Sequence, residues 1–149
     1  MSTARLARNS DLPGLLALFA VSEVSEAAEP QDRAQTIWQE ILARPGLATF
    51  VSDAGDTVVA TCMLVMAPNL LRGGRQHGFL ENVVTHPHWR GHGHGRAVVG
   101  AALAHAWAQD CHHVLMQSGR ADLRVQDFYE GLGFKPGLRI GYVADRPRA

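Results

Sequence analysis

The chain has 149 residues with 14 basic and 14 acidic side chains, so its formal net charge at pH 7 is zero. This balance argues against nucleic acid as the main partner, because proteins that bind nucleic acid carry a basic excess to neutralise phosphates. Hydrophobic residues make up 46% and charged residues 19%, which is typical of a globular protein and excludes a disordered chain. The length predicts one domain spanning residues 1–149.

Cysteine usage and hydropathy indicate a reducing, cytoplasmic location and no membrane partner. Cys62 and Cys111 lie far apart and form no CxxC pair, so neither a disulfide framework nor a thiolate zinc site is expected. No apolar run reaches the ~18 residues that a membrane span needs. The run Leu12–Val21 is interrupted by Pro13 and Gly14, and it predicts a helix rather than a signal peptide.

Hydrophobic periodicity and turn residues predict a mixed α/β fold. In chain order, the first half is predicted to contain a strand at Thr3–Arg8, a helix from Asp11 to about Val21, a polar connection at Ser22–Gln31, a helix at Gln31–Arg44, and a β-hairpin made of Ala48–Ser52 and Thr57–Met66. The second half is predicted to contain a loop at Pro68–Gln76, a strand at Gly78–Thr85, a helix at Gly95–Gln109, a strand at His113–Gln117, a helix at Leu123–Leu132 and a last strand at Gly137–Ala144. The strand–helix–strand order there implies a parallel pair. Trp38 and Trp107 lie on apolar helix faces and are predicted to be core residues.

The segment Leu80–Gly95 carries the strongest chemical signal. It combines a strand, a loop with three alternating glycines and the start of a helix. The glycines are Gly91, Gly93 and Gly95, and Arg90 and Arg96 flank them. Glycines leave the backbone N–H groups uncovered, and the positive end of the helix dipole adds to them, so the loop predicts a phosphate or pyrophosphate site. The loop has neither the lysine of a Walker A motif nor the spacing of a dinucleotide-binding loop.

Two motifs together resemble the GNAT superfamily of acyl-CoA-dependent N-acyltransferases. The run from Arg90 to Gly95 matches R-x-x-G-x-G and, preceded by V-V-T-H-P, resembles motif A of that family. The run from Asp127 to Phe134, DFYEGLGF, resembles motif B, F-Y-x-x-x-G-F. The resemblance is clear over Val58–Phe134. It implies an α/β fold with a central mixed, mostly antiparallel sheet, about four flanking helices and a splayed parallel strand pair at the cofactor site.

The resemblance also implies where acetyl-CoA would bind. Backbone groups of Val83, Val84 and Thr85 are expected to pair with the pantetheine arm. The pyrophosphate is expected to sit on the backbone N–H groups of Arg90, Gly91, His92, Gly93, His94, Gly95 and Arg96. Where the family often has an asparagine that contacts the pantetheine, this chain has Asp122.

Glu81 and Tyr129 are the candidate catalytic residues. Tyr129 matches the motif B tyrosine, which is the usual proton donor to the leaving thiolate in the family. Strand alternation places Glu81 on the same face as Phe79 and Val83. The Glu81–Asn82 pair resembles the E-D pair of polyamine and amino-sugar acetyltransferases, whose glutamate lies near the acceptor amine or a base water. The alternative is a structural ion pair between Glu81 and an arginine.

The implied function is transfer of an acetyl group from acetyl-CoA to a primary amine of a small molecule, with polyamines, amino sugars and amino-acid-like compounds as candidate acceptors. The alternatives are an acyl-CoA-binding sensor without turnover and a non-CoA nucleotide binder. No metal is expected, because His92 and His94 lie inside the phosphate loop. The acceptor stays open: Glu23, Glu26 and Glu29 could attract a cationic amine, whereas Arg120, Arg124 and Arg139 could hold an anionic one. A homodimer formed through the last strand is also expected.

Overall fold

The computed structural model describes residues 1–119 and 122–148. It divides the chain into two compact units, Met1–Met116 and Gln117–Ala149, and each unit is described by itself. Arg120, a candidate anion contact in the sequence, lies outside the described residues. In the described part of the chain, no helix is both long enough and apolar enough to cross a membrane.

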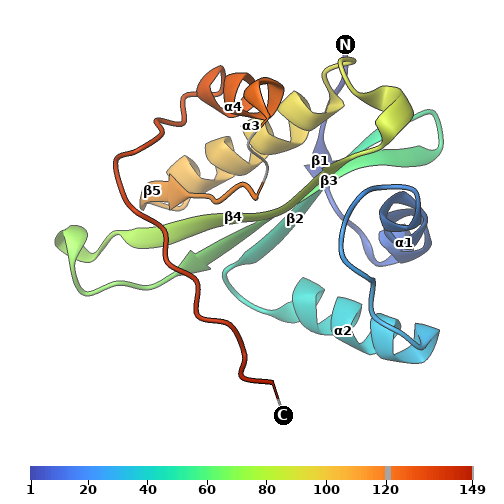
Figure 1. Cartoon of the computed structure of the whole chain (residues 1–149). Helices are drawn as coiled ribbons and strands as arrows, with labels where there is room; N and C mark the ends of the chain where they lie inside the picture. Colours follow the sequence, from blue (N-terminus) through green and yellow to red (C-terminus); the bar gives the residue numbers. More distant parts are fainter. Residues whose placement is uncertain (120–121, 149) are drawn as a thin grey trace. The chain divides into compact units, whose positions relative to one another are not determined.

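The first unit is built on a five-stranded sheet with strand order β1-β2-β3-β4-β5 (Figure 1). All neighbouring strands are antiparallel except β4 and β5, which run parallel. The strands are β1 (Arg5–Leu6), β2 (Leu47–Ala54), β3 (Thr57–Ala67), β4 (Gln76–Thr85) and β5 (Cys111–Leu115). The helices are α1 (Leu12–Ala20), α2 (Gln31–Ala43) and α3 (His94–Ala108), with short 3-10 turns η1 (Asn9–Asp11), η2 (Arg72–Gly74) and η3 (Pro87–Trp89). The predicted mixed α/β class with its parallel pair is confirmed.

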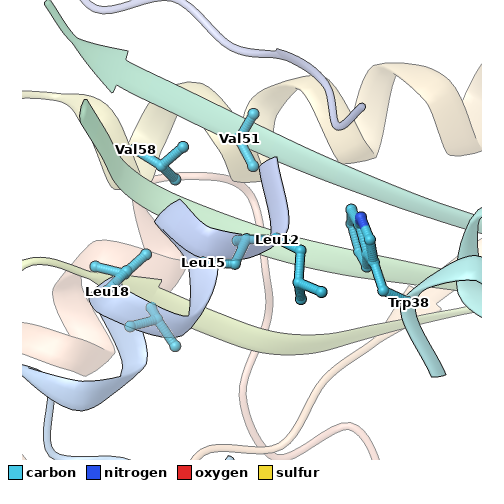
Figure 2. Close-up of a cluster of buried hydrophobic side chains, with 7 residues drawn as sticks. Leu12, Leu15, Leu18, Trp38, Val51 and Val58 are labelled. Carbon is cyan, nitrogen blue, oxygen red and sulfur yellow. The ribbon is translucent and has the colours of Figure 1, made fainter. Parts of the chain in front are cut away.

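The helices cover both faces of this sheet. Helices α1 and α2 pack on one face, which we call the α1/α2 face, and α3 packs on the other (Figure 1). Apolar side chains from α1, α2 and the central strands form a buried cluster on the α1/α2 face (Figure 2); it comprises Leu12, Leu15, Leu18, Trp38, Val51, Val58 and Val84. Burial of these side chains is the main source of stability for the packing of α1 and α2 on the sheet, beside the candidate site described below.

Trp107 differs from the prediction, whereas Trp38 agrees with it. Trp38 is buried at 4% exposure, but Trp107 is 53% exposed. Helix α3 carries apolar residues on most of its surface, so periodicity alone does not select the buried face. The small and β-branched side chains of Val98, Ala102 and Ala106 occupy that face, which allows α3 to approach the sheet closely.

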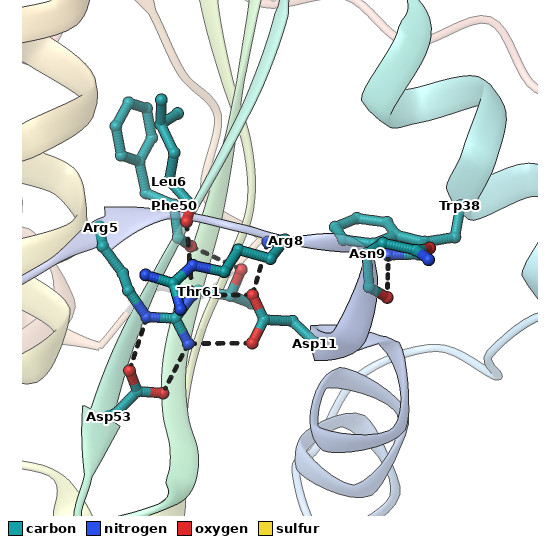
Figure 3. Close-up of polar contacts among 9 residues, drawn as sticks. All are labelled: Arg5, Leu6, Arg8, Asn9, Asp11, Trp38, Phe50, Asp53 and Thr61. Carbon is teal, nitrogen blue, oxygen red and sulfur yellow. Dashed lines mark hydrogen bonds and ion pairs between the residues drawn. The ribbon is translucent and has the colours of Figure 1, made fainter.

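A charged network joins the start of the chain to the sheet (Figure 3). The Arg5 guanidinium donates to both carboxylate oxygens of Asp11 at 2.8 and 2.9 Å, and its Nε donates to Asp53 at 2.8 Å. Asp11 is buried, and its hydrogen bonds with Arg5 hold the pKa of its carboxyl below the usual range. The network therefore ties β1 and η1 to β2 and fixes the point where α1 begins.

Strand β4 contains an irregularity that strand alternation does not predict. Its ladder to β3 passes from Glu81 opposite Met63 to Val84 opposite Thr61, so that Asn82 and Val83 together face one β3 residue. Asn82 has a φ of 51°, in the left-handed region that asparagine tolerates better than most residues. Together these features define a β-bulge, in which one strand carries an extra residue.

The second unit contains helix α4 (Leu123–Glu130). The Asp122 carboxylate caps it by accepting a hydrogen bond from the Arg124 N–H at 2.9 Å. The predicted last strand at Gly137–Ala144 is wrong: the segment has no strand, and its apolar side chains are exposed. Alternation is only one requirement of a strand, because a strand also needs a partner for its backbone groups.

Candidate active site

In the second half of β4, one edge of the strand has no neighbouring strand among the described residues. The parallel ladder with β5 runs from Gln76 to Phe79, where Phe79 lies opposite Leu115, but β4 itself continues to Thr85. The bulge at Asn82 and Val83 lies within this second half. Backbone N–H and C=O groups on the free edge can therefore pair with an extended ligand in place of a strand.

The glycine loop follows directly after this edge. Residues from Pro87 to Gly93 are exposed, and Gly93 is the N-cap of α3 with a φ of 88°. A glycine has no Cβ to strain this left-handed conformation, and the first turn of a helix offers N–H groups that the helix itself does not use. Arg90 and Arg96 are exposed on either side of the loop. The loop thus has the geometry and charge of an anion site.

Within the loop, the N–H groups are not equivalent. The His92 N–H donates to the Trp89 carbonyl at 3.4 Å, and the His92 carbonyl accepts from the Ser2 hydroxyl at 2.8 Å. The Trp89 ring contacts the rings of His92 and His94 edge-on, with centroids 5.6 and 5.5 Å away. Contacts within the loop and the hydrogen bond from Ser2 therefore hold the loop in this conformation.

The buried side chain of His94 connects the loop to the sheet. Its ring is buried, and its Nδ1 lies 2.8 Å from the Ser52 hydroxyl, which itself donates to the Thr3 carbonyl at 2.6 Å. Since the Ser52 hydroxyl hydrogen is committed to Thr3, Nδ1 of His94 carries the proton and donates to Ser52. Burial lowers the pKa of His94, and His92 lowers it further, whereas Asp53 acts in the opposite direction. The ring therefore supports the loop as a neutral group.

This arrangement predicts a pH dependence of stability. The unfolded chain protonates a histidine near pH 6.5, whereas folded His94 takes up a proton only at lower pH. The unfolded state thus binds more protons in that interval, so the free energy of unfolding should fall as the pH drops below about 6.5. Thermal unfolding between pH 5 and 8 should show a shallower pH dependence for His94→Gln than for the wild type. The control His88→Gln, at an exposed position in η3, should keep the wild-type slope, and equal slopes for all three proteins would contradict this role of His94.

A cavity of about 310 Å³ opens on the α1/α2 face of the sheet, beside the bulge. Its walls come from α1, the segment 24–28, α2 and the central strands, and β4 contributes Asn82, Val83 and Val84. Because the same three residues follow Glu81 and precede the glycine loop, the cavity and the open β4 edge meet at the bulge. A ligand on the edge and a second ligand in the cavity would be neighbours.

Glu81 is exposed, and the residues that share its face of the sheet differ from those that strict alternation predicts. Residues paired across an antiparallel ladder share a face, so Glu81 lies with Met63 and Val84 lies with Thr61. Thr61 and Met63 are two positions apart and share a face as well. The bulge therefore places Glu81 on the face of Val84, and the expectation that it shares a face with Val83 is wrong. This is the α1/α2 face, where Val84 packs with α1.

Tyr129 and Asp122 belong to the second unit, whereas Glu81 belongs to the first. Tyr129 lies on α4, half-buried, with its ring edge-on to Phe128 and Phe134 at 5.0 and 5.8 Å. Asp122 uses one carboxylate oxygen as the cap of α4. Its expected contact with the pantetheine stays a prediction, as does the role of Tyr129.

Two features of the site were missed by sequence reasoning. Asn82 forms the bulge, and the available signal was an asparagine, a residue that tolerates the left-handed region, in the middle of a strand. Thr49 lines the cavity from β2, with its hydroxyl buried and without a hydrogen-bond partner among the described residues. No local signal marks Thr49, because only the packing of α2 against the sheet encloses it.

The first unit thus combines a bulged strand, an open β4 edge and a glycine loop at a helix start, and comparisons with known proteins identify the family. The family model described as Acetyltransferase (GNAT) family matches residues 13–134. Among solved structures, a proposed acetyltransferase from Agrobacterium tumefaciens str. C58 is 38% identical with a TM-score of 0.89, covering 97% of this chain and 99% of its own. An acetyltransferase from Trypanosoma brucei is 27% identical with a TM-score of 0.80 over the same shares.

The chain therefore belongs to the GNAT acetyltransferase family. A curated relative, glucosamine 6-phosphate N-acetyltransferase from Trypanosoma brucei brucei, is 33% identical over 94 residues. That alignment covers 62% of this chain and 62% of the relative, so the chain spans less than two thirds of the relative's length. The family resemblance inferred from motifs A and B is thus confirmed.

Proposed function

We propose that the chain transfers the acetyl group of acetyl-CoA directly to a primary amine of a small molecule. The observation that carries the proposal is the continuous run of open β4 edge, bulge and exposed glycine loop at the start of α3. The edge offers backbone partners to the pantetheine through Val83, Val84 and Thr85, and the loop offers N–H groups and two arginines to the pyrophosphate. Membership of the GNAT family supports acetyl-CoA as the donor.

In this proposal the amine nitrogen attacks the thioester carbonyl carbon, the C–S bond breaks, and an amide and free CoA are formed. Glu81, directly or through a water, takes the proton that the ammonium must lose before attack. The Val83 N–H in the bulge donates to the oxyanion that develops on the carbonyl oxygen. Tyr129 gives its proton to the departing thiolate, the attacking nitrogen releases its second proton to solvent as the amide forms, and Tyr129 regains a proton from solvent. Positioning of the two substrates supplies most of the acceleration.

Thiol release from acetyl-CoA, followed with a thiol-reactive dye and a panel of amines, tests this function. Glu81→Gln should lower kcat/KM roughly 10²-fold near pH 7, because it keeps the shape but loses the proton acceptor. The loss should shrink at high pH, where the free amine is abundant without a base. Asp56→Asn, an exposed carboxylate in the β2–β3 turn, is the matched control and should retain wild-type rates.

Other results would reassign the chain or the residue. A Glu81→Gln variant that loses stability but keeps the wild-type pH profile would identify a structural ion pair. A KM increase confined to amines with a second positive charge would identify an acceptor contact. Tight acetyl-CoA binding without thiol release for any amine would indicate an acyl-CoA-binding module instead of an enzyme.

The proposal extends to a homodimer in the cytoplasm. Both cysteines are free and buried, as suits a reducing compartment. Leu138, Ile140 and Tyr142 expose at least 74% of their surface in the C-terminal segment, and apolar segments of this kind favour association between copies. Light scattering should give twice the 16.2 kDa chain mass at micromolar concentration, and the monomer mass would refute the dimer.

A further inference from the structure

The cavity beside the bulge has walls of hydrocarbon. Phe19 from α1, Ile37 and Trp38 from α2, and Met63 from β3 all line it. The Trp38 indole N–H, the polar atom of that ring, donates to the Asn9 carbonyl at 3.2 Å and leaves the ring to act as an apolar surface. Such a lining favours a ligand that itself brings carbon surface.

Two polar groups stand out in this lining. Glu26 is the one charged side chain among the described residues that line the cavity. The Thr49 hydroxyl is buried and has no hydrogen-bond partner among the described residues, whereas the Thr61 hydroxyl nearby donates to the Phe50 carbonyl at 2.8 Å. A buried hydroxyl without a partner is costly, so a ligand that bonds to Thr49 gains from filling that role.

The same lining is poorly suited to a sugar phosphate. Phosphate groups are held in proteins by arginine, lysine or clustered backbone N–H groups. Among the described residues that line the cavity there is no arginine or lysine, and the carboxylate of Glu26 would repel a dianion. The lining is therefore unsuited to glucosamine 6-phosphate, the compound that appears in the name of the curated relative from Trypanosoma brucei brucei.

Size and register define the body of the ligand. A cavity of about 150 Å³ holds a benzene ring, so about 310 Å³ admits one ring with a short arm. Thr49, Met63 and Glu81 lie abreast on β2, β3 and β4, which separates Thr49 from Glu81 by two strand spacings, about 10 Å. A ring that carries an aminoethyl arm on one side and a hydroxyl on the other can bridge this distance.

We infer that the acceptor is a primary amine on a compact apolar body, with its ring or branched alkyl part in the cavity, its amine at the β4 bulge and a polar substituent at Thr49. This inference rests on the proposed function, because it names the substrate class of that same site. Glu26 attracts the cationic amine toward the cavity, and a lining without arginine or lysine among its described residues disfavours phosphorylated sugars.

The test compares three acceptors by thiol release from acetyl-CoA: tyramine, 2-phenylethylamine and glucosamine 6-phosphate. Tyramine should exceed 2-phenylethylamine in kcat/KM, because a site with an unpaired hydroxyl favours the ligand that pairs with it. It should exceed glucosamine 6-phosphate by at least ~10-fold, because the described residues of the apolar lining offer no cation to the phosphate. A higher kcat/KM for glucosamine 6-phosphate than for both aromatic amines would overturn the inference.

Variants then test the two polar groups. Thr49→Val keeps the shape of the side chain and should abolish the preference for tyramine over 2-phenylethylamine. Glu26→Gln should raise KM for both aromatic amines, by an amount that shrinks as the salt concentration rises. Asp56→Asn, an exposed carboxylate in the β2–β3 turn and outside the cavity lining, is the control and should leave KM unchanged. A tyramine preference that survives in Thr49→Val would exclude the contact with Thr49.

Direct binding separates failure of this inference from failure of the proposed function. If no amine gives thiol release, titration calorimetry with tyramine still reports on the cavity. Tyramine binding to the wild type that weakens in Thr49→Val would support the cavity assignment in a protein without turnover. Absence of tyramine binding would overturn the inference even if another amine, such as a polyamine, gives thiol release and so supports the proposed function.

Discussion

Replacing Gly93 with valine is expected to abolish acetyl-CoA binding. Gly93 has a φ of 88° at the N-cap of α3, so a β-branched residue would force the loop out of the conformation that exposes its N–H groups. In the wild type, acetyl-CoA at about 100 times its Kd should stabilise the fold by about 2.7 kcal/mol and raise the melting temperature. In Gly93→Val this ligand-dependent increase should disappear.

The control must carry the same backbone strain away from the site. Gly55, in the turn between β2 and β3, has a φ of 61° and no atoms within 4 Å of an added Cβ. Gly55→Val should lose about 1–3 kcal/mol of stability, as left-handed strain costs, and keep the full acetyl-CoA effect. A folded Gly93→Val protein with wild-type affinity for acetyl-CoA would refute the assignment of the loop.

Tyr129→Phe is expected to lower kcat roughly 10²-fold, the usual contribution of a positioned acid. Phenylalanine keeps the aromatic contacts with Phe128 and Phe134, so the substitution removes the hydroxyl and leaves the packing of the second unit. The affinity for acetyl-CoA should therefore stay close to that of the wild type, and the loss should appear in kcat.

The other tyrosine of the chain provides the matched control. Tyr142 is 86% exposed in the C-terminal segment, and Tyr142→Phe should keep the wild-type kcat. Turnover of Tyr129→Phe at the wild-type rate with a good acceptor would show that water or another group protonates the thiolate. Equal losses in both variants would show a structural effect of the second unit instead.

Local patterns in the sequence predicted most elements of the first unit. The Gly-containing turn between β2 and β3 and the helical spacing through Trp38 are each contained in a few consecutive residues, so the hairpin and the helix could be predicted from local sequence. The glycine loop was equally visible, because its conformation and its chemistry come from the same residues. The C-terminal segment shows the limit of this reasoning, since its alternating apolar residues have the period of a strand but no ladder.

The rest of the site depends on contacts between distant segments. The bulge at Asn82 shifts the faces of β4 by one residue, and a rule of strict alternation therefore gives the wrong neighbour for Glu81. The cavity combines residues from α1, α2 and three strands, so Thr49 and Glu26 become neighbours of one space only after folding. Motif reasoning pointed to the glycine loop, which is the proposed donor side, whereas the cavity proposed for the acceptor is visible only in the packed structure.

The bulge in β4 also bears on how the protein resists aggregation when no ligand is bound. A straight strand edge with unused N–H and C=O groups is a template to which a strand of another molecule can add. Between Leu80 and Thr85, the extra residue interrupts the regular spacing of these groups and increases the local twist of the strand. An extended, flexible ligand can follow such an edge, whereas a rigid, regularly spaced strand of another chain cannot pair along its length.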